Sequence, residues 1–260
     1  MGSEPAEVYA ALLTPLAPDG GVHEAALRAH CRSLVAAGID GVLVAGTTGE
    51  GPLLGDDEVV RAVSALAGET RVLAHVGRPS TAATVALAKR ALDAGADELS
   101  VVVPYYYDLG DEQVLRHFSA VVEAVSSVLA YVIPARTVND VSADLLARLA
   151  EAGVAGVKDS TKSLERHEEY LDVARGQAGF RVYMGSDGLA AEALERGATG
   201  LISAVANARP ELVVALRDGA SEIKPELLAV RAEAGGLSGL KRLVAERIDG
   251  YPVAVRAPLG

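Results

Sequence analysis

The chain has 260 residues, of which 50% are hydrophobic and 23% charged, a balance typical of globular proteins and not of disordered or membrane-embedded chains. Its formal net charge of −11 disfavours nucleic acid and anionic membrane surfaces as main partners, because both require a basic face. No apolar run approaches the roughly 18–20 residues that span a bilayer, and the N-terminus lacks a basic segment followed by an apolar one, so we expect a cytoplasmic protein.

Four segments share one layout, in which a helical stretch ends at a glycine, crosses a short loop and enters an apolar strand. The four glycines are Gly38, Gly95, Gly153 and Gly197. Glycine just past a helix C-terminus is typical of a left-handed cap, so these segments are predicted to join a helix to a strand. The first three glycines are almost evenly spaced, and each interval leaves room for two strand–helix units.

Eight apolar strand segments follow one another along the chain, and helical periodicity, as in residues 81–93, separates them. In chain order they are YAALLTP, GVLVAG, RVLAHVG, ELSVVVP, SVLAYVIP, VAGVKDS, FRVYMGS and GLISA. This alternation over about 250 residues predicts an α/β fold, a (β/α)8 TIM barrel, with the barrel through strand eight in residues 1–207. Residues 208–260 are expected to hold the last barrel helix and a short C-terminal helical extension. A doubly wound sheet is disfavoured because no Gly-rich dinucleotide turn is present.

Polar residues follow most of the predicted strands, at the end of a TIM barrel where active sites lie. These ends read GTTGEG, PYYYD, YVIPART, KDS, GSDG and SAVAN. They supply hydroxyls, a lysine and an arginine without a cluster of His, Asp and Glu, so we expect neither a metal nor another cofactor. Only His75 lies on a strand among the histidines, either lining the site or hydrogen-bonded inside the barrel.

Lys158 ends an apolar strand, where a lysine is rarely buried without a partner. A lysine held against apolar walls loses proton affinity and can attack a carbonyl to form a Schiff base. The alternative is an ion pair with Asp159. Tyr131, on the preceding strand, could exchange protons with the carbinolamine. The GTTGE turn could hold a carboxylate through its N–H groups and Thr hydroxyls, although a tight turn explains it equally well.

In this order and spacing the motifs resemble the dihydrodipicolinate synthase and N-acetylneuraminate lyase family of class I aldolases. The resemblance runs from ALLTPLAPDGGV through GTTGEGPLL, PYYY, YVIPART and GVKDS to GLISAVANARPEL. It implies that Lys158 is the Schiff-base lysine and Tyr131 the general acid/base. Thr47 and Thr48 would relay protons and hold the carboxylate of pyruvate or another 2-oxo acid. Tyr106 would reach into a neighbouring subunit's site, which implies a homodimer or homotetramer.

Arg136 stands where the synthases of this family place the arginine that receives the second substrate's carboxylate, and a guanidinium fits a carboxylate bidentately. The alternative is an ion pair with Asp140 or Asp159. Gly185 and Ile202, at the ends of strands seven and eight, complete the candidate substrate-binding residues.

The chain also departs from the family pattern. Val132 replaces the usual Asn after the catalytic tyrosine, the TKS sequence after Asp159 lacks the usual Gly, and the segment after strand eight is short. The resemblance therefore implies a divergent, C-terminally shortened member. Three functions remain open: a synthase condensing pyruvate with an aldehyde such as aspartate semialdehyde, an aldolase acting on 2-keto-3-deoxy sugar acids, and a non-catalytic 2-oxo acid sensor.

Overall fold

The computed structural model describes residues 5–259. Eight parallel strands close into a barrel in which each strand pairs with the next along the chain and β8 returns to β1. The strands are β1 (Glu7–Ala11), β2 (Gly41–Val44), β3 (Arg71–His75), β4 (Glu98–Val102), β5 (Val128–Val132), β6 (Gly156–Asp159), β7 (Arg181–Met184) and β8 (Gly200–Ser203). The predicted (β/α)8 barrel is confirmed.

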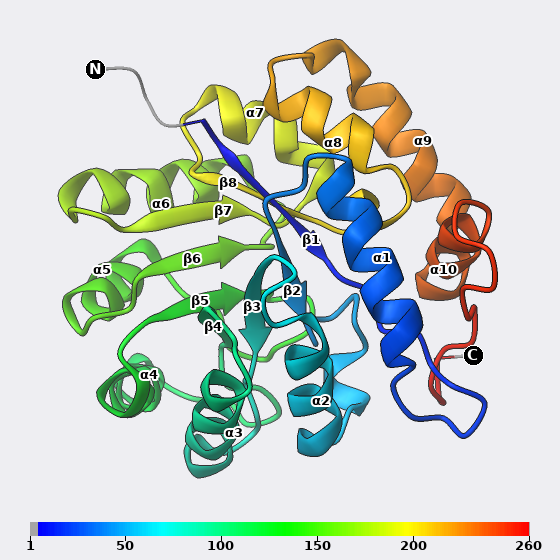
Figure 1. Ribbon diagram of the computed structural model, residues 1–260. Coiled ribbons are helices and arrows are strands. Elements are labelled where there is room, and N and C mark those ends of the chain that lie inside the picture. The colour runs from blue at the N-terminus through cyan, green and yellow to red at the C-terminus, as the bar shows by residue number, and fades with distance from the viewer. Residues whose placement is uncertain (1–4, 260) are drawn as a thin grey trace.

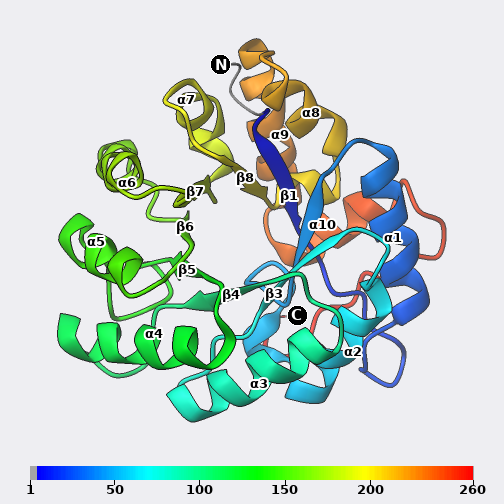
Figure 2. The ribbon, with the colours of Figure 1, turned by 60° about the vertical axis from the view of Figure 1, so that its left-hand side comes forward.

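Eight helices alternate with the strands and form a ring around them (Figure 2). They are α1 (Glu24–Ala36), α2 (Asp56–Leu66), α3 (Thr81–Asp93), α4 (Asp111–Val125), α5 (Ala143–Glu151), α6 (Leu164–Gly176), α7 (Ala190–Glu195) and α8 (Pro210–Arg217). Short 3-10 helices are η1 (Gly51–Leu53), η2 (Asp187–Leu189), η3 (Val205–Asn207) and η4 (Ser221–Ile223), and the chain continues into α9 (Lys224–Ala234) and α10 (Leu237–Ala245).

The four junction glycines adopt the left-handed conformation predicted for them. Their φ angles are +93° at Gly38, +99° at Gly95, +97° at Gly153 and +91° at Gly197. In this region a side chain would be strained, so glycine lets each helix end and the chain turn directly into the next strand.

Serine residues cap several helices at the carboxyl end of the barrel, where the chain passes from a strand into the next helix. The hydroxyls of Ser80, Ser142 and Ser163 accept hydrogen bonds from backbone N–H groups in the first turns of α3, α5 and α6. Each such cap stabilises a helix by about 1 kcal/mol. The loops after β3, β5 and β6 thus end at defined positions near the carboxyl ends of the strands.

Alternation along the strands sorts side chains into two apolar regions. Outward side chains pack under the helices in the main core, and inward side chains fill the barrel. The inward cluster consists of Tyr9, Ala11, Leu43, Leu73, Leu129, Tyr183 and Ile202. The barrel centre is therefore packed, and a cavity can open only at one of its ends.

Ion pairs occupy the amino-terminal end of the barrel. Arg71 Nη1 lies 2.6 Å from Glu7 Oε1, and Arg181 pairs with Glu98. Tyr183 donates its hydroxyl hydrogen to Glu7. Partial burial opposes ionisation of Glu7, but the hydrogen bonds from Tyr183 and Arg71 hold the pKa of this carboxyl below its ordinary value. This end of the barrel is thus closed by charges that satisfy one another.

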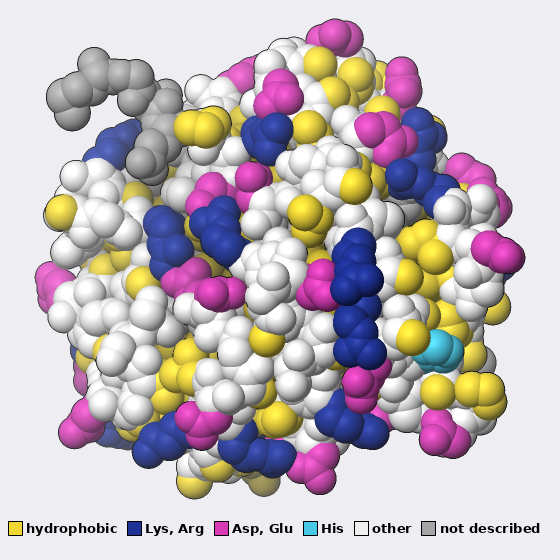
Figure 3. All heavy atoms as spheres, viewed as in Figure 1, with side chains coloured by type: hydrophobic (Ala, Val, Ile, Leu, Met, Phe, Trp, Pro, Cys, Tyr) yellow, Lys and Arg dark blue, Asp and Glu magenta, His cyan; other side chains and the backbone are white. Residues whose placement is uncertain are grey.

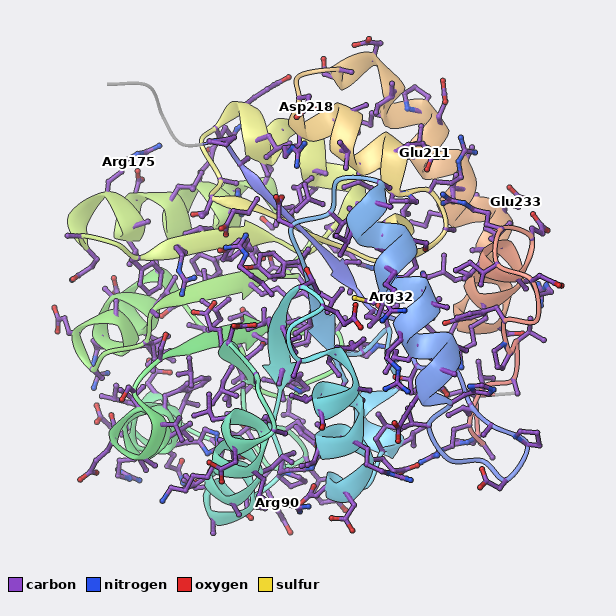
Figure 4. The ribbon with its side chains drawn as sticks, viewed as in Figure 1. Arg32, Arg90, Arg175, Glu211, Asp218 and Glu233 are labelled. Carbon is purple, nitrogen blue, oxygen red and sulfur yellow. The ribbon has the colours of Figure 1, made fainter. Side chains whose placement is uncertain are left out.

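The helices after the barrel lie over its carboxyl end. The helices α9 and α10 pack against each other at the right of Figure 1, α9 contacts η2 after β7, and both contact η3 after β8. No helix within residues 5–259 is long and apolar enough to cross a membrane. Positive and negative side chains are interspersed over the face in Figure 3, and Arg90, Arg175 and Glu233 point away from the barrel in Figure 4.

A buried ion pair ties the loop after β2 to the C-terminal region. Lys241 Nζ of α10 lies 2.6 Å from Glu50 Oε1 and 2.6 Å from the carbonyl oxygen of Ala254. The second Glu50 carboxylate oxygen accepts the backbone N–H of Arg256 at 2.6 Å. Both charged side chains are 0% exposed, so each depends on the other for compensation.

Replacing Lys241 by methionine should therefore lower the free energy of unfolding by about 3–5 kcal/mol, because it leaves the Glu50 carboxylate buried without its cation. Urea denaturation monitored by circular dichroism measures this change. The double variant Glu50→Gln/Lys241→Met should lose less. The neighbouring exposed Arg242→Met is the matched control and should change stability by less than about 0.5 kcal/mol. Equal losses in the Lys241 and Arg242 variants would contradict the role of the pair.

Candidate active site

A cavity of 640 Å³ opens at the carboxyl ends of the strands. It brings together seven of the eight site residues predicted from the sequence and leaves out Tyr106. The seven are Thr47, Thr48, Tyr131, Arg136, Lys158, Gly185 and Ile202. They come from β5, β6 and β8 and from the segments that follow β2, β5 and β7, as expected for a TIM-barrel site.

Lys158 lies at the base of this cavity, because the register of β6 directs its side chain inward. The residue pairs with Tyr131 of β5 and Tyr183 of β7 and is 4% exposed. Its Nζ lies 4.2 Å from the centre of the Tyr131 ring, over the electron-rich face. The ammonium thus has an aromatic neighbour and an open cavity in front of it.

Asp159 faces the opposite side of β6, under the helices. Its Oδ2 lies 2.9 Å from Nδ1 of His167 in α6, and both side chains are 0% exposed. Its Oδ1 accepts the backbone N–H of Thr161 at 2.8 Å. The alternative that Asp159 pairs with Lys158 is therefore wrong, since adjacent residues of a strand point to opposite faces.

Gly185 makes room for the lysine. A Cβ at this position would lie 2.2 Å from Oγ of Ser160 and 3.0 Å from Cε of Lys158. The first distance is impossible without movement, and the second would press on the lysine side chain. Glycine is thus required for the close approach of the β7 end to β6.

The GTTGE turn after β2 places Thr47 against the tyrosine. Thr47 Oγ1 and the Tyr131 hydroxyl are 3.0 Å apart and share a hydrogen bond. The turn is tight, since a Cβ on Gly51 would lie 1.7 Å from the carbonyl oxygen of Ala45. Within residues 5–259 the backbone N–H groups of Thr47 and Thr48 have no hydrogen-bond acceptor. They remain available to an anion in the cavity.

His75 lies inside the barrel and does not line the cavity. Its ring meets the Tyr131 ring edge-on, with 5.7 Å between centroids, and the residue is 4% exposed. Burial, with smaller effects from Arg78 and Lys158, lowers the pKa of His75 to about 3. The imidazole is therefore neutral at ordinary pH and supports the tyrosine ring from one side.

Tyr106 lies on the surface, away from the cavity of its own chain. It is 77% exposed and has a φ of +82°, a strained conformation for a tyrosine. Asn139 holds the loop around it, because Nδ2 donates to the carbonyl oxygens of Pro104 at 2.6 Å and Tyr107 at 2.9 Å. The exposed ring is thus presented by a loop with a fixed backbone.

Arg136 lines the cavity without a carboxylate partner in the described part of the chain. Asp140 Oδ2 lies 3.2 Å from Nη1 of Arg166, and Asp159 Oδ2 lies 2.9 Å from Nδ1 of His167. Both alternatives for Arg136 are therefore wrong, and its guanidinium is free to meet a ligand.

Sequence reasoning missed three charged residues of the cavity, namely Asp187, Lys162 and Arg231. Asp187 follows β7 and shares a hydrogen bond with Ser203 at 2.5 Å, and burial raises the pKa of its carboxyl. Asp187 and Lys162 could have been identified from the sequence, because each lies shortly after a predicted strand. Nothing local could have identified Arg231, which comes from α9 beyond the barrel. No group of three His, Cys, Asp or Glu side chains able to hold a metal occurs among residues 5–259.

Comparison with known proteins gives similarities to one family model, one relative and two solved structures. Residues 4–230 match the model of the dihydrodipicolinate synthetase family. A 4-hydroxy-tetrahydrodipicolinate synthase of Aromatoleum aromaticum is 37% identical over 89% of this chain and 80% of its own length. Two solved structures, each 26% identical over 97% of this chain, are similar. One is YagE of Escherichia coli in complex with pyruvate (TM-score 0.91, 92% of its length), and the other a Sulfolobus 2-keto-3-deoxygluconate aldolase (TM-score 0.86, 89%).

Burial of the neutral His75 predicts a specific loss of stability in acid. Its folded-state pKa of about 3 lies below the ordinary value near 6.5, so its contribution is complete above pH 6.5 and is lost as pH falls toward 3. Between pH 7 and pH 5 this loss amounts to about 2 kcal/mol. We expect His75→Gln to reduce the pH dependence of the free energy of unfolding by that amount, as measured by urea titrations at both pH values. An unchanged pH dependence would contradict the neutral, buried imidazole.

Proposed function

Because the chain belongs to the dihydrodipicolinate synthetase family, we propose that it is a class I lyase that forms a Schiff base between Lys158 and a 2-oxo acid. It would condense pyruvate, or another 2-oxo acid, with an aldehyde, or cleave the corresponding aldol. One observation carries this proposal. Lys158 is buried at the base of the cavity, stacked on an aromatic ring and without a carboxylate to pair with in the described chain.

The geometry supports a complete sequence of steps for pyruvate. Lys158 Nζ attacks the C2 carbonyl carbon, and the resulting carbinolamine loses water to give the Schiff base. Loss of a proton from C3 gives an enamine, which adds to the aldehyde carbon, and water then releases the product and the free lysine. The Tyr131 hydroxyl, hydrogen-bonded to Thr47, is the proposed general acid/base for these proton transfers.

The pyruvate carboxylate has its own proposed site at the GTTGE turn. The N–H groups of Thr47 and Thr48 lack acceptors among the described residues, and the Thr side chains line the cavity. Oriented amides of this kind bind carboxylates. Ile202, buried beside the cavity, and Gly185 would flank the bound 2-oxo acid.

The acceptor can be of two kinds. The free Arg136 guanidinium favours an aldehyde that carries a carboxylate, as in the synthase reaction, whereas similarity to a 2-keto-3-deoxygluconate aldolase favours a sugar-derived aldehyde. Both reactions use the same Lys158 and Tyr131. A sensor that binds a 2-oxo acid without turning it over is the remaining alternative.

A second copy of the chain is the proposed partner. Tyr106 is exposed, apolar over most of its surface and held in a strained backbone conformation, and Tyr107 beside it is 67% exposed. Strain of this kind persists where it serves a function. We propose that Tyr106 inserts at the active site of the neighbouring subunit in a homodimer or homotetramer and joins the proton relay there.

Lys158→Ala should abolish both turnover and adduct formation. In the unaltered protein, borohydride reduction in the presence of pyruvate should add one reduced pyruvate to Lys158, as detected by intact mass and peptide mapping. The exposed Lys89→Ala should trap pyruvate like the unaltered protein. Absence of an adduct in the unaltered protein would favour the sensor, and an adduct in Lys158→Ala would move the nucleophile elsewhere.

Tyr131→Phe should lower kcat by about 10²- to 10⁴-fold, because it removes the hydroxyl that exchanges protons but keeps the ring under Lys158. Pyruvate loss in the presence of an aldehyde panel measures this rate. The adduct should still form, although more slowly. An unaltered kcat would show that another group supplies the proton.

A further inference from the structure

Asp159, the residue after Lys158, is a fully buried carboxylate that is bonded on both oxygens. Its Oδ1 accepts the backbone N–H of Thr161 at 2.8 Å and the Thr161 hydroxyl at 2.7 Å. Its Oδ2 accepts a hydrogen bond from Nδ1 of His167 in α6 at 2.9 Å. Within residues 5–259 no other hydrogen bond reaches Oδ2. The carboxylate therefore joins β6, the loop after it and α6 at one point.

The neighbouring strand β5 offers no substitute for the histidine. Val132 stands opposite Asp159 in the register of β5 and β6, and it is buried in the main core under the helices. A valine side chain has no hydrogen-bonding group. Because a buried carboxylate oxygen without a donor costs free energy, the contact from α6 is the one that satisfies Oδ2.

The backbone around this carboxylate also carries the proposed nucleophile. The N–H of Ser160 donates to the carbonyl oxygen of Val132 at 2.8 Å, and the N–H of Gly185 donates to the carbonyl oxygen of Asp159 at 2.7 Å. On the inner face, the register holds Lys158 between β5 and β7. Lys158 and Asp159 share one rigid peptide group, so a movement that releases the Asp159 side chain also reorients Lys158.

We infer that His167 is a positioning residue for Lys158. By holding the Asp159 carboxylate on the outer face of β6, it fixes the direction in which Lys158 leaves the inner face, with Nζ 4.2 Å from the centre of the Tyr131 ring. His167 is itself buried under the helices and does not line the cavity. The inference rests on the proposed function for the reaction of Lys158, and it adds to that site a residue of the outer helix layer.

His167→Leu and His167→Asn form a matched pair that tests the inference. The Asn amide nitrogen takes nearly the place of the imidazole Nδ1, and Leu has nearly the same size without a donor. At saturating pyruvate, the rate constant of adduct formation should fall at least roughly tenfold in His167→Leu and stay within about threefold in His167→Asn, because a misplacement of about 1 Å can cost about 10²-fold. Time courses quenched with borohydride and read by intact mass give this rate constant.

The same time courses give the pyruvate concentration at half saturation. It should change by less than about threefold in both variants, because the GTTGE turn proposed to hold the carboxylate is untouched. Circular dichroism shows whether each variant is folded. If His167→Leu does not fold, His167→Gln replaces it in the pair, because its amide nitrogen takes nearly the place of Nε2 and not of Nδ1.

His117 of α4 provides the control, because it has the same bonding pattern away from the site. Its Nδ1 lies 2.9 Å from Oγ1 of Thr81 in α3, and within residues 5–259 its Nε2, like that of His167, is buried without a partner. His117→Leu should leave the rate constant within about twofold, whatever its effect on the urea midpoint. A tenfold fall in this control, or equal rate constants in the two His167 variants, would overturn the inference.

The position of the lysine keeps this inference separate from the proposed function. If the unaltered protein forms no pyruvate adduct, the proposed lyase function fails, and crystal structures of the unaltered protein and the two His167 variants replace the rate measurement. We expect Nζ of Lys158 to move by at least about 1 Å relative to the Tyr131 ring in His167→Leu and to keep its place in His167→Asn. An unmoved Nζ in His167→Leu would refute the positioning role.

Discussion

The register between β5, β6 and β7 is the constraint on which the site depends. It sets Lys158 opposite Tyr131 and Tyr183 on the inner face, and it sends Asp159 outward to His167 of α6. A slip of one residue in β6 would reverse this, burying a carboxylate in the barrel and an ammonium under the helices. The Asp159–His167 contact outside the barrel therefore helps to hold the lysine inside it.

The loop that carries Thr47 is stabilised from outside the barrel repeat. Glu50, which has a left-handed backbone with a φ of +59°, turns its carboxylate into the buried contact with Lys241 of α10. Glu50 lies three positions after Thr47, and Thr47 Oγ1 lies 3.0 Å from the Tyr131 hydroxyl. Helix α10 thus supports the loop after β2, which carries the Thr47 hydroxyl. The C-terminal segment therefore takes part in building the site.

Much of this architecture could be predicted from the sequence, because barrel repeats are local patterns. Helix C-caps such as Gly95 and strand ends such as that of Lys158 follow from neighbours within a few residues. Contacts between distant segments could not be predicted in this way. Lys241 gave no local sign of its pairing with Glu50, and Arg231 lies on a helix that the repeat does not define. Excluding an ion pair between Lys158 and Asp159 also required the structure, because it is the strand geometry that sends the two side chains to opposite faces of β6.

The two ends of the barrel differ in how their charges are arranged. At the amino-terminal end Glu7 pairs with Arg71 and Glu98 with Arg181, so cations and anions neutralise one another. At the carboxyl end the cations Lys158, Arg136, Lys162 and Arg231 share the cavity with the single carboxylate of Asp187. Burial raises the pKa of that carboxyl above its ordinary value. In a chain with a formal charge of −11, this cavity thus gathers four cations around one carboxylate, an arrangement that attracts an anion to the place where the lysine lies.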